Sequence, residues 1–362
     1  MDNSHDASTR ILRAVVLGAG SQGAVHASAL AGRAGVEIVA VADPSEQAAR
    51  ELAARHGAVA RRDAAESLDA DRPDIVSICT PPAVHADLTR RAIASGARAV
   101  HVEKPIALTY GDALDMRDRA RAAGAQLTVN HQRRLDPLHR AVAAEVADGA
   151  IGDVITASGY CANLFDWGSH TVDLLRLHLG DPAAEWVLAQ IDVAARKRVY
   201  GALTETSSVV RIRFAGDREA VVVTGRDDGP LHPRGSAGIV VNGTGGRIEV
   251  FGRIARVLAD GRPVREIVGD DGGAPSIGGA DPEIVHATAL AVADLVDALR
   301  RSRPAVLDIE NGLRAAEIVF AAYESSVRRG RVDLPLGIRD NPLQRGLDDG
   351  IWTPVDEIVA TY

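Results

Sequence analysis

The chain has 362 residues, of which 46% are hydrophobic, and its 41 Lys and Arg against 49 Asp and Glu give a formal net charge of −8. This length is too great for one small core and predicts two domains. The acidic balance argues against nucleic acid or an anionic membrane as the partner, and it is compatible with a small neutral or cationic ligand.

The cysteine content and the first residues indicate where the protein works. Cys79 and Cys161 are too few for a disulfide framework, which favours a reducing compartment. The first ten residues are polar and lack the apolar core of a signal peptide, and no apolar run is long enough to span a bilayer. We therefore expect a soluble, cytoplasmic protein without a membrane partner.

The first third of the chain alternates short β-branched runs with longer helical stretches rich in Ala and Arg. This alternation is typical of a parallel sheet with crossover helices, and each expected strand is followed by a turn signal. The expected strands are 13–18, 36–43, 74–80, 97–103 and 125–130. The sequence thus predicts a doubly wound α/β domain over residues 1–133.

After an expected helix within 133–153, longer strands with period-two alternation predict a second domain over residues 134–362. Residues 207–225 and 237–252 are typical of antiparallel hairpins, with turns near 216–217 and 243–246. Two stretches rich in Gly, Pro and Asp, 225–238 and 270–281, are expected as exposed loops, and surface loops are favoured over lids. Two late amphipathic helices, 282–303 and 309–330, are expected to pack on the domain junction or on the sheet.

Gly18, Gly20 and Gly23 form the pattern G-x-G-x-x-G directly between the first expected strand and a helix. In this context the pattern predicts a dinucleotide site, because the glycines permit a tight turn and the pyrophosphate can lie on the helix N-terminus. Ser21 and Gln22, inside the motif, are included among the cofactor contacts. Asp43 ends the second strand, where a carboxylate binds the ribose hydroxyls and repels a 2′-phosphate. We therefore expect NAD rather than NADP.

An apolar strand ends in Glu103-Lys104-Pro105. A lysine at this point is either an exposed residue paired with Glu103 or a catalytic group at the carboxyl edge of the sheet, where ligands bind. Pro105 fixes the backbone there and removes a donor. In the catalytic interpretation, Lys104 lies beside a nicotinamide and a substrate.

Asp166, His170 and Asp173 recur at i, i+4 and i+7 and share one helix face. A helix cap explains Asp166 equally well, but it does not explain an imidazole and carboxylates on one face. Zinc is an alternative for Asp and His, yet no further Cys or His lies at ligand spacing, so we expect no metal.

Further candidates follow strand ends or flank this helix. For the cofactor they are Thr80, Pro81, His85, Glu103 and Asn130. For the substrate they are Tyr160, Asn163 and Trp167, although Trp167 fits a core position equally well.

Several stretches together resemble the glucose-fructose oxidoreductase / inositol dehydrogenase (Gfo/Idh/MocA) family over nearly the whole chain. They are "GAGSQG", "ICTPPAVHADL", "VEKPIAL", "VNHQRRLDP", the D-x-x-x-H of Asp166 and His170, and "NGLRAAEIVFAAYESSVRRGRVDLP". The resemblance implies that Lys104, Asp166 and His170 are the catalytic set. It also implies a Rossmann domain, a C-terminal domain with a large open sheet that makes dimer or tetramer contacts, and NAD(P)-dependent chemistry on sugars and polyols.

The leading hypothesis is an NAD-dependent dehydrogenase that acts on a secondary hydroxyl, or on the corresponding ketone, of a sugar, amino sugar or cyclitol. Such a reaction needs a hydride acceptor and a base at one carbinol. Lys104 or His170 can be that base, and the residues leave this choice open. The alternatives are an NAD-dependent glycosidase of the same family and a non-catalytic NAD or sugar sensor.

Overall fold

A computed structural model describes residues 10–225, 231–235 and 237–360. The chain forms two compact units: the first comprises Met1–Ala107, Asp112–Gln132 and Asp271–Gly312, and the second comprises Leu108–Gly111, Arg133–Asp270 and Leu313–Tyr362. The chain leaves the first unit briefly at Leu108–Gly111 and again at Arg133, next to the boundary that the sequence predicts between residues 133 and 134. Residues 271–312 differ, because they cluster with the first unit although the sequence assigns them to the second domain.

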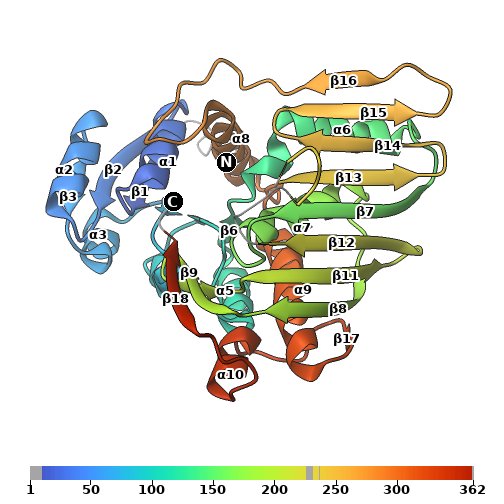
Figure 1. The fold of residues 1–362 in the computed structure, drawn as a ribbon. Coiled ribbons are helices and arrows are strands. Elements are labelled where there is room, and N and C mark those ends of the chain that lie inside the picture. The colour runs from blue at the N-terminus through green and yellow to red at the C-terminus, as the bar shows by residue number, and fades with distance from the viewer. Residues whose placement is uncertain (1–9, 226–230, 236, 361–362) are drawn as a thin grey trace. The chain divides into compact units, whose positions relative to one another are not determined.

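The first unit contains a six-stranded parallel sheet in the order β3-β2-β1-β4-β5-β6 (Figure 1). Its strands are β1 (Leu12–Leu17), β2 (Val36–Ala42), β3 (Val59–Arg61), β4 (Ile75–Ile78), β5 (Ala99–Val102) and β6 (Gln126–Val129). The predicted doubly wound sheet is confirmed. Only β3 is absent from the prediction, because three residues are too few to show a period.

Helices cover both faces of this sheet, as parallel strands require. They are α1 (Ser21–Ala31), α2 (Glu46–Arg55), α3 (Ala64–Asp71), η2 (Pro82–Val84), α4 (His85–Ala94), α5 (Tyr110–Ala123) and α8 (Pro282–Arg301). Helix α8 joins the core of the first unit: Val292, Leu295 and Leu299 pack in one buried cluster with Val16 and Leu30. This apolar face explains why α8 belongs with α1 rather than with the later sheet.

The second unit contains a nine-stranded sheet in the order β16-β15-β14-β13-β7-β12-β11-β8-β17. Its strands are β7 (Val154–Cys161), β8 (Ala184–Asp192), β11 (Ser207–Phe214), β12 (Arg218–Thr224), β13 (Gly238–Gly243), β14 (Gly246–Phe251), β15 (Ile254–Ala259), β16 (Arg265–Val268) and β17 (Val332–Asp333). Strands β7 and β12 are parallel and the other pairs are antiparallel. The predicted hairpins and the mostly antiparallel sheet are confirmed.

Helices lie behind one face of this sheet (Figure 1). They are α6 (Pro137–Ala147), which follows the 3-10 turn η3 (Gln132–Leu135), then α7 (Trp167–His178) and α9 (Ile309–Arg328). A Cβ at Gly159 would meet Thr171 and Leu175, so this side of β7 faces α7. Because side chains alternate along a strand, Tyr160 lies on the opposite face.

The second unit also contains a smaller sheet and a short last helix. The sheet has three strands in the order β10-β9-β18. Its strands and the last helix are β9 (Ala195–Val199), β10 (Ala202–Thr204), β18 (Asp356–Ala360) and α10 (Pro342–Asp348). None of the helices in the described part of the chain is long and apolar enough to cross a bilayer.

Candidate active site

The glycine-rich turn between β1 and α1 has the geometry that a pyrophosphate site needs. Gly18 has φ +95°, and a Cβ there would come within 2.7 Å of the carbonyl oxygen of Cys79. A Cβ at Gly23 would come within 2.0 Å of the carbonyl oxygen of Gly18, whereas a Cβ at Gly20 would meet nothing within 4 Å. Gly18 and Gly23 therefore permit the tight turn, and Gly20 leaves room for a ligand to approach the backbone.

Helix α1 and Asp43 complete a site that fits NAD. The first turn of α1 carries no acidic side chain, and no side chain caps it, so its positive end is available to an anion. Asp43 follows β2, and its Oδ2 and Oδ1 accept the backbone N–H groups of Ala19 and Ser45, both at 2.8 Å. These bonds hold the carboxylate beside the turn, where its remaining lone pairs suit ribose hydroxyls and its charge disfavours a 2′-phosphate.

A loop that the sequence assigns to the second domain lies against this turn. A Cβ at Gly278 would come within 3.0 Å of both Cα and the carbonyl oxygen of Ser21, and Gly278 has φ +60°. Nearby, Ile277 packs against a buried cluster that contains Val25 of α1. The loop between β16 and α8 is therefore anchored on the dinucleotide-binding turn. Its sequence signal, a Gly-Gly pair beside an isolated Ile, does not show where the loop packs.

Lys104 lies at the carboxyl end of β5, on the same sheet edge as Gly18 and Asp43. Glu103 does not form the exposed pair that the surface interpretation requires, because the residue is only 6% exposed. Glu103 Oε1 accepts bonds from His26 Nε2 at 2.9 Å and from Asn130 Nδ2 at 2.7 Å, and Oε2 accepts the Lys104 N–H at 3.1 Å. Glu103 and Asn130 are thus bonded to protein groups at the carboxyl end of β5 and β6, and their role as cofactor contacts stays a prediction.

Thr80, Pro81 and His85 lie at the end of β4. His85 is fully buried, with Nε2 at 2.8 Å from the carbonyl oxygen of Thr80 and Nδ1 at 2.9 Å from that of Pro105. Burial lowers the pKa of His85, and a neutral ring donates to only one of the two carbonyls. His85 therefore joins the loops after β4 and β5. Among the described residues, the buried Oγ1 of Thr80 has no hydrogen-bond partner, which suits a ligand hydroxyl.

In the second unit, Asp166 and His170 lie at the start of α7. Asp166 is the residue before the first helical position, but its side chain makes no cap bond; Asn163 Oδ1 accepts the N–H groups of Asp166 at 2.8 Å and Trp167 at 3.3 Å instead. Asn163 is buried, and its Nδ2 has no partner among the described residues. The side-chain cap of α7 is thus supplied by Asn163 rather than by Asp166.

The other residues near α7 have separate places. Asp173 forms a buried ion pair with Arg134, 2.8 Å between Oδ1 and Nη2, so it is structural. The guanidinium of Arg133 lies 5.6 Å from the ring centre of Trp167, a cation–π contact at the helix start. Tyr160 instead lies on the helix-free face of the sheet beside His232, with ring centres 5.1 Å apart. The second unit therefore brings together Asn163, Asp166, Trp167 and His170, but not Tyr160.

Glu205 is a functional candidate that the sequence does not reveal. It is fully buried between β10 and β11, and its carboxylate accepts bonds from the N–H of Leu164 at 2.5 Å and from three hydroxyl groups. The hydroxyl donors are Thr204 at 2.8 Å, Thr224 at 2.9 Å and Tyr323 at 2.8 Å. Glu205 therefore fixes the backbone two residues before Asp166. Because Leu164, Thr224 and Tyr323 lie far from Glu205 in the sequence, no local motif indicates them.

One sequence signal for Lys104 goes beyond its motif. Lys104 and Lys197 are the only lysines in a chain with 41 Lys and Arg residues in all. Arginine remains charged in proteins, whereas lysine can lose its proton. This rarity of lysine makes Lys104, at the sheet edge, a candidate for the catalytic base.

Within the described ranges, no group of three or more His, Cys, Asp or Glu side chains is arranged to hold a metal ion.

Comparisons with known proteins place the chain in a family. The model of the oxidoreductase family with an NAD-binding Rossmann fold matches residues 12–131. The inositol 2-dehydrogenase of Rhizobium meliloti (strain 1021) is 34% identical over 277 residues, which cover 71% of this chain and 78% of that protein. The chain belongs to the Gfo/Idh/MocA oxidoreductase family.

Solved structures agree with this membership. A putative myo-inositol dehydrogenase from Sinorhizobium meliloti 1021 is 25% identical, with a TM-score of 0.70 over 89% of this chain and 99% of that one. An inositol dehydrogenase homologue from Azotobacter vinelandii, complexed with NADH and myo-inositol, has a TM-score of 0.75 at 20% identity, covering 92% of this chain and all of that one, and it shows the fold alone. The predicted family, the oxidoreductase class and the NAD cofactor are confirmed by the family model and the sequence relative.

Proposed function

We propose that the chain oxidises a secondary hydroxyl of a sugar, amino sugar or cyclitol with NAD, or reduces the corresponding ketone. The observation that carries the proposal is the edge of the six-stranded sheet, where the Gly18 turn follows β1 and Lys104 follows β5 with only β4 between these strands. Ligands of doubly wound sheets bind at this edge. A dinucleotide site and a titratable amine therefore occupy one side of one sheet.

The residues divide the chemistry between them. NAD, when bound, supplies the acceptor for the hydride. The amine of Lys104 takes the hydroxyl proton, since a base within hydrogen-bond reach of that proton is required. His170 bonds to the same oxygen or relays the proton, and Asp166 orients a neighbouring hydroxyl of the substrate. Asn163 and Glu205 hold the backbone that carries Asp166.

The test is NADH formation with a panel of inositols, hexoses, amino sugars and aminoglycosides. The parent protein is expected to form NADH with one class of these compounds and with NAD in preference to NADP. Lys104→Ala should lower kcat by about 10²- to 10⁴-fold, the usual contribution of a positioned base. Lys104→Arg should not restore it, because a guanidinium does not give up its proton. Release of an aglycone without NADH would instead indicate a glycosidase, and NAD binding without any turnover would indicate a sensor.

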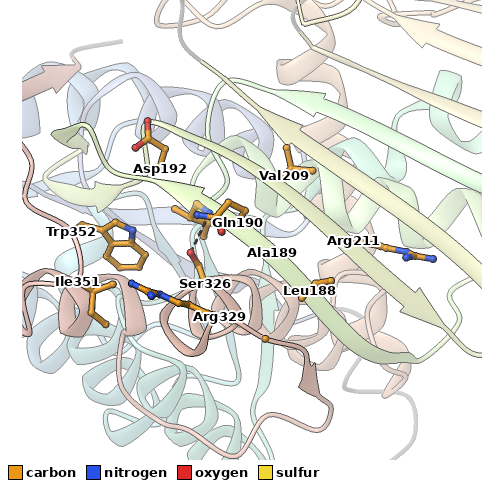
Figure 2. Close-up of a pocket in the computed structure, with 12 residues that line it drawn as sticks. Leu188, Ala189, Gln190, Asp192, Val209, Arg211, Ser326, Arg329, Ile351 and Trp352 are labelled. Atoms are coloured by element: carbon orange, nitrogen blue, oxygen red, sulfur yellow. Dashed lines mark hydrogen bonds between the residues drawn. The ribbon is translucent and has the colours of Figure 1, made fainter.

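We also propose that the chain forms a homo-dimer or homo-tetramer through the nine-stranded sheet. Leu188 and Val209 are 43% and 53% exposed on the face without helices. A cavity of about 690 Å³ lies at the β8 side of the sheet, where Trp352 and Arg329 approach the strand (Figure 2). None of the predicted site residues lines it. Because exposed apolar patches mark contact surfaces, a second copy is the expected cover, and a monomeric sedimentation profile would contradict this.

We propose the cytoplasm as the location. Cys79 and Cys161 are both free thiols, which fits a reducing compartment. Fractionation of the source cells tests this, and recovery of the protein outside the cytoplasm would overturn it.

A further inference from the structure

A buried polar cluster lies beneath Lys104. His26 of α1 is fully buried, and its Nε2 donates to Glu103 Oε1 at 2.9 Å. Its Nδ1 lies 2.6 Å from the Oγ of Ser77 on β4. Asn130, after β6, donates to the same carboxylate oxygen of Glu103 at 2.7 Å. Helix α1 and the end of β6 thus each provide a donor to the carboxylate of Glu103, whose other oxygen accepts the N–H of Lys104 at 3.1 Å.

The surroundings shift the pKa values of the two central groups in directions that favour opposite charges. Burial lowers the pKa of His26, but Cys79 and Glu103 outweigh it and raise that pKa to about 10. Burial raises the pKa of Glu103, but the bond and charge of His26, together with Lys104 and Asn130, lower it to about 2. An imidazolium and a carboxylate are therefore buried as a pair.

Other titratable groups face this pair from each neighbouring element. They are Cys79 at the end of β4, His85 of α4, His101 of β5, and Lys104. Burial and the charge of His26 lower the pKa of His101 to about 3, so this ring is neutral beside His26, 5.1 Å away between centres. His26 is therefore the cation that balances Glu103 from inside the unit.

We propose that His26 is a positioning residue for Lys104: its buried positive charge neutralises the Glu103 carboxylate, which holds the Lys104 backbone, so that this carboxylate does not stabilise the ammonium form of Lys104. The inference rests on the proposed function, in which Lys104 must lose its proton to act as the base. A buried ion pair costs desolvation energy that apolar side chains would avoid. Because Glu103 directly precedes Lys104, we attribute the presence of this costly pair to its effect on the lysine amine.

The chain makes a direct test possible because it has only two lysines. Selective ¹³C labelling of lysine gives two side-chain signals, and Lys104→Arg assigns them. In His26→Gln, Glu103 keeps its charge without the imidazolium, so the pKa of Lys104 should rise by about one unit or more. In the double variant His26→Gln/Glu103→Gln both charges are gone, and the pKa of Lys104 should return to that of the parent. Lys197, in the second unit, serves as the internal reference.

A second measurement needs no variant of the cluster. In the parent protein labelled with ¹⁵N-histidine, His26 should give imidazolium shifts at neutral pH, whereas His101 should be neutral. This keeps the inference testable if His26→Gln does not fold. A neutral His26 in the parent would overturn the proposal.

Kinetics provide the readout at the level of turnover. In His26→Gln, kcat/KM should fall about tenfold below the pKa of the base and recover at alkaline pH, because one unit of pKa changes the deprotonated fraction tenfold. His139→Gln, which replaces a buried histidine of the second unit, should leave the pH profile of kcat/KM in place. The affinity for NAD, measured by calorimetry, should change little in either variant.

The outcomes separate this inference from the proposed function. An unchanged Lys104 titration in His26→Gln, or a loss of activity that is equal at every pH, would show that His26 is merely structural. A parent protein that turns over no compound of the panel would contradict the proposed function, while the NMR titrations would still support or overturn the role of His26.

Discussion

Two buried carboxylates, one in each unit, hold the backbone next to a candidate catalytic residue, but they are stabilised differently. Glu103 in the first unit is paired with the His26 imidazolium and accepts the N–H of Lys104. Glu205 in the second unit accepts the N–H of Leu164 and bonds from neutral hydroxyl groups, among them that of Tyr323. A histidine ring bonds to the first carboxylate, whereas the second accepts bonds from one backbone N–H and three hydroxyl groups. The difference indicates that the first cluster governs charge at the site and the second governs position alone.

The largest loss of stability is expected when Glu205 is replaced, because its hydrogen-bond donors then lose their acceptor. Glu205→Leu leaves the Leu164 N–H and the hydroxyls of Tyr323 and its neighbours without an acceptor in a buried place, at about 1–3 kcal/mol for each group that stays unsatisfied. The free energy of unfolding should therefore fall by about 3–5 kcal/mol in denaturant titration. Burial and the Glu205 carboxylate raise the pKa of Tyr323, so this hydroxyl stays a donor at all ordinary pH values.

Glu219→Gln is the matched control for this loss. Glu219 forms ion pairs with Arg211 and Arg213 on the same sheet, but these are partly exposed. Such a pair contributes at most about 1 kcal/mol. If Glu205→Leu lowered the free energy of unfolding no more than this control does, the hydrogen bonds to Glu205 would not contribute to stability.

An effect of intermediate size is expected from pH, and it has opposite signs in the two units. Burial lowers the pKa of His139 in the second unit to about 3. From about pH 6.5 down to that value the unfolded chain binds a proton that the folded chain does not, so stability is lost as pH falls, by about 1.4 kcal/mol per pH unit. For His26 the folded pKa, about 10, lies above the unfolded one, so its contribution is complete below pH 6.5 and is lost as pH rises towards 10.

Unfolding free energies measured across this pH range test both signs. His139→Gln should flatten the acid side by about 1.4 kcal/mol per pH unit, and His26→Gln should flatten the alkaline side. The same slope in both variants would show that the two histidines do not differ in charge.

The residues that the sequence predicts lie in short motifs, whereas the partners that it misses lie far apart in the chain. Gly18, Gly20, Gly23, Asp43 and Lys104 were predictable because each lies in a short motif at a strand end. Contacts across long sequence separations were not predictable: His26 lies 77 residues from Glu103, and Glu205 lies 118 residues from Tyr323. Such partners depend on the tertiary fold, and a lone His or Glu in a sequence carries no sign of them.

The assignment of Asn163 shows a subtler limit. The D-x-x-x-H spacing indicates a helix face and leaves the cap to Asp166, yet Asn163, three residues earlier, provides the cap oxygen. Both residue types are good caps, so propensity alone does not choose between them. The choice depends on the Leu164 backbone, which Glu205 holds in place.

The smallest effect is expected at the loop that packs on the dinucleotide turn. Gly278→Val places a branched side chain at a residue with φ +60°, within 3.0 Å of the backbone of Ser21. The loop must then move, and the start of α1 loses a neighbour, so the KM for NAD should rise several-fold while kcat with saturating NAD stays close to that of the parent. Gly279→Val is the control, because a Cβ at Gly279 meets nothing within 4 Å, whereas its φ of +84° gives the same side chain a similar backbone strain. Equal changes in KM for both variants would mean that strain in the loop, rather than its contact with Ser21, affects the cofactor. If only Gly278→Val raised the KM for NAD, the cofactor site of the first unit would include a residue far from the glycine motif. Glu205 is the corresponding distant residue in the second unit.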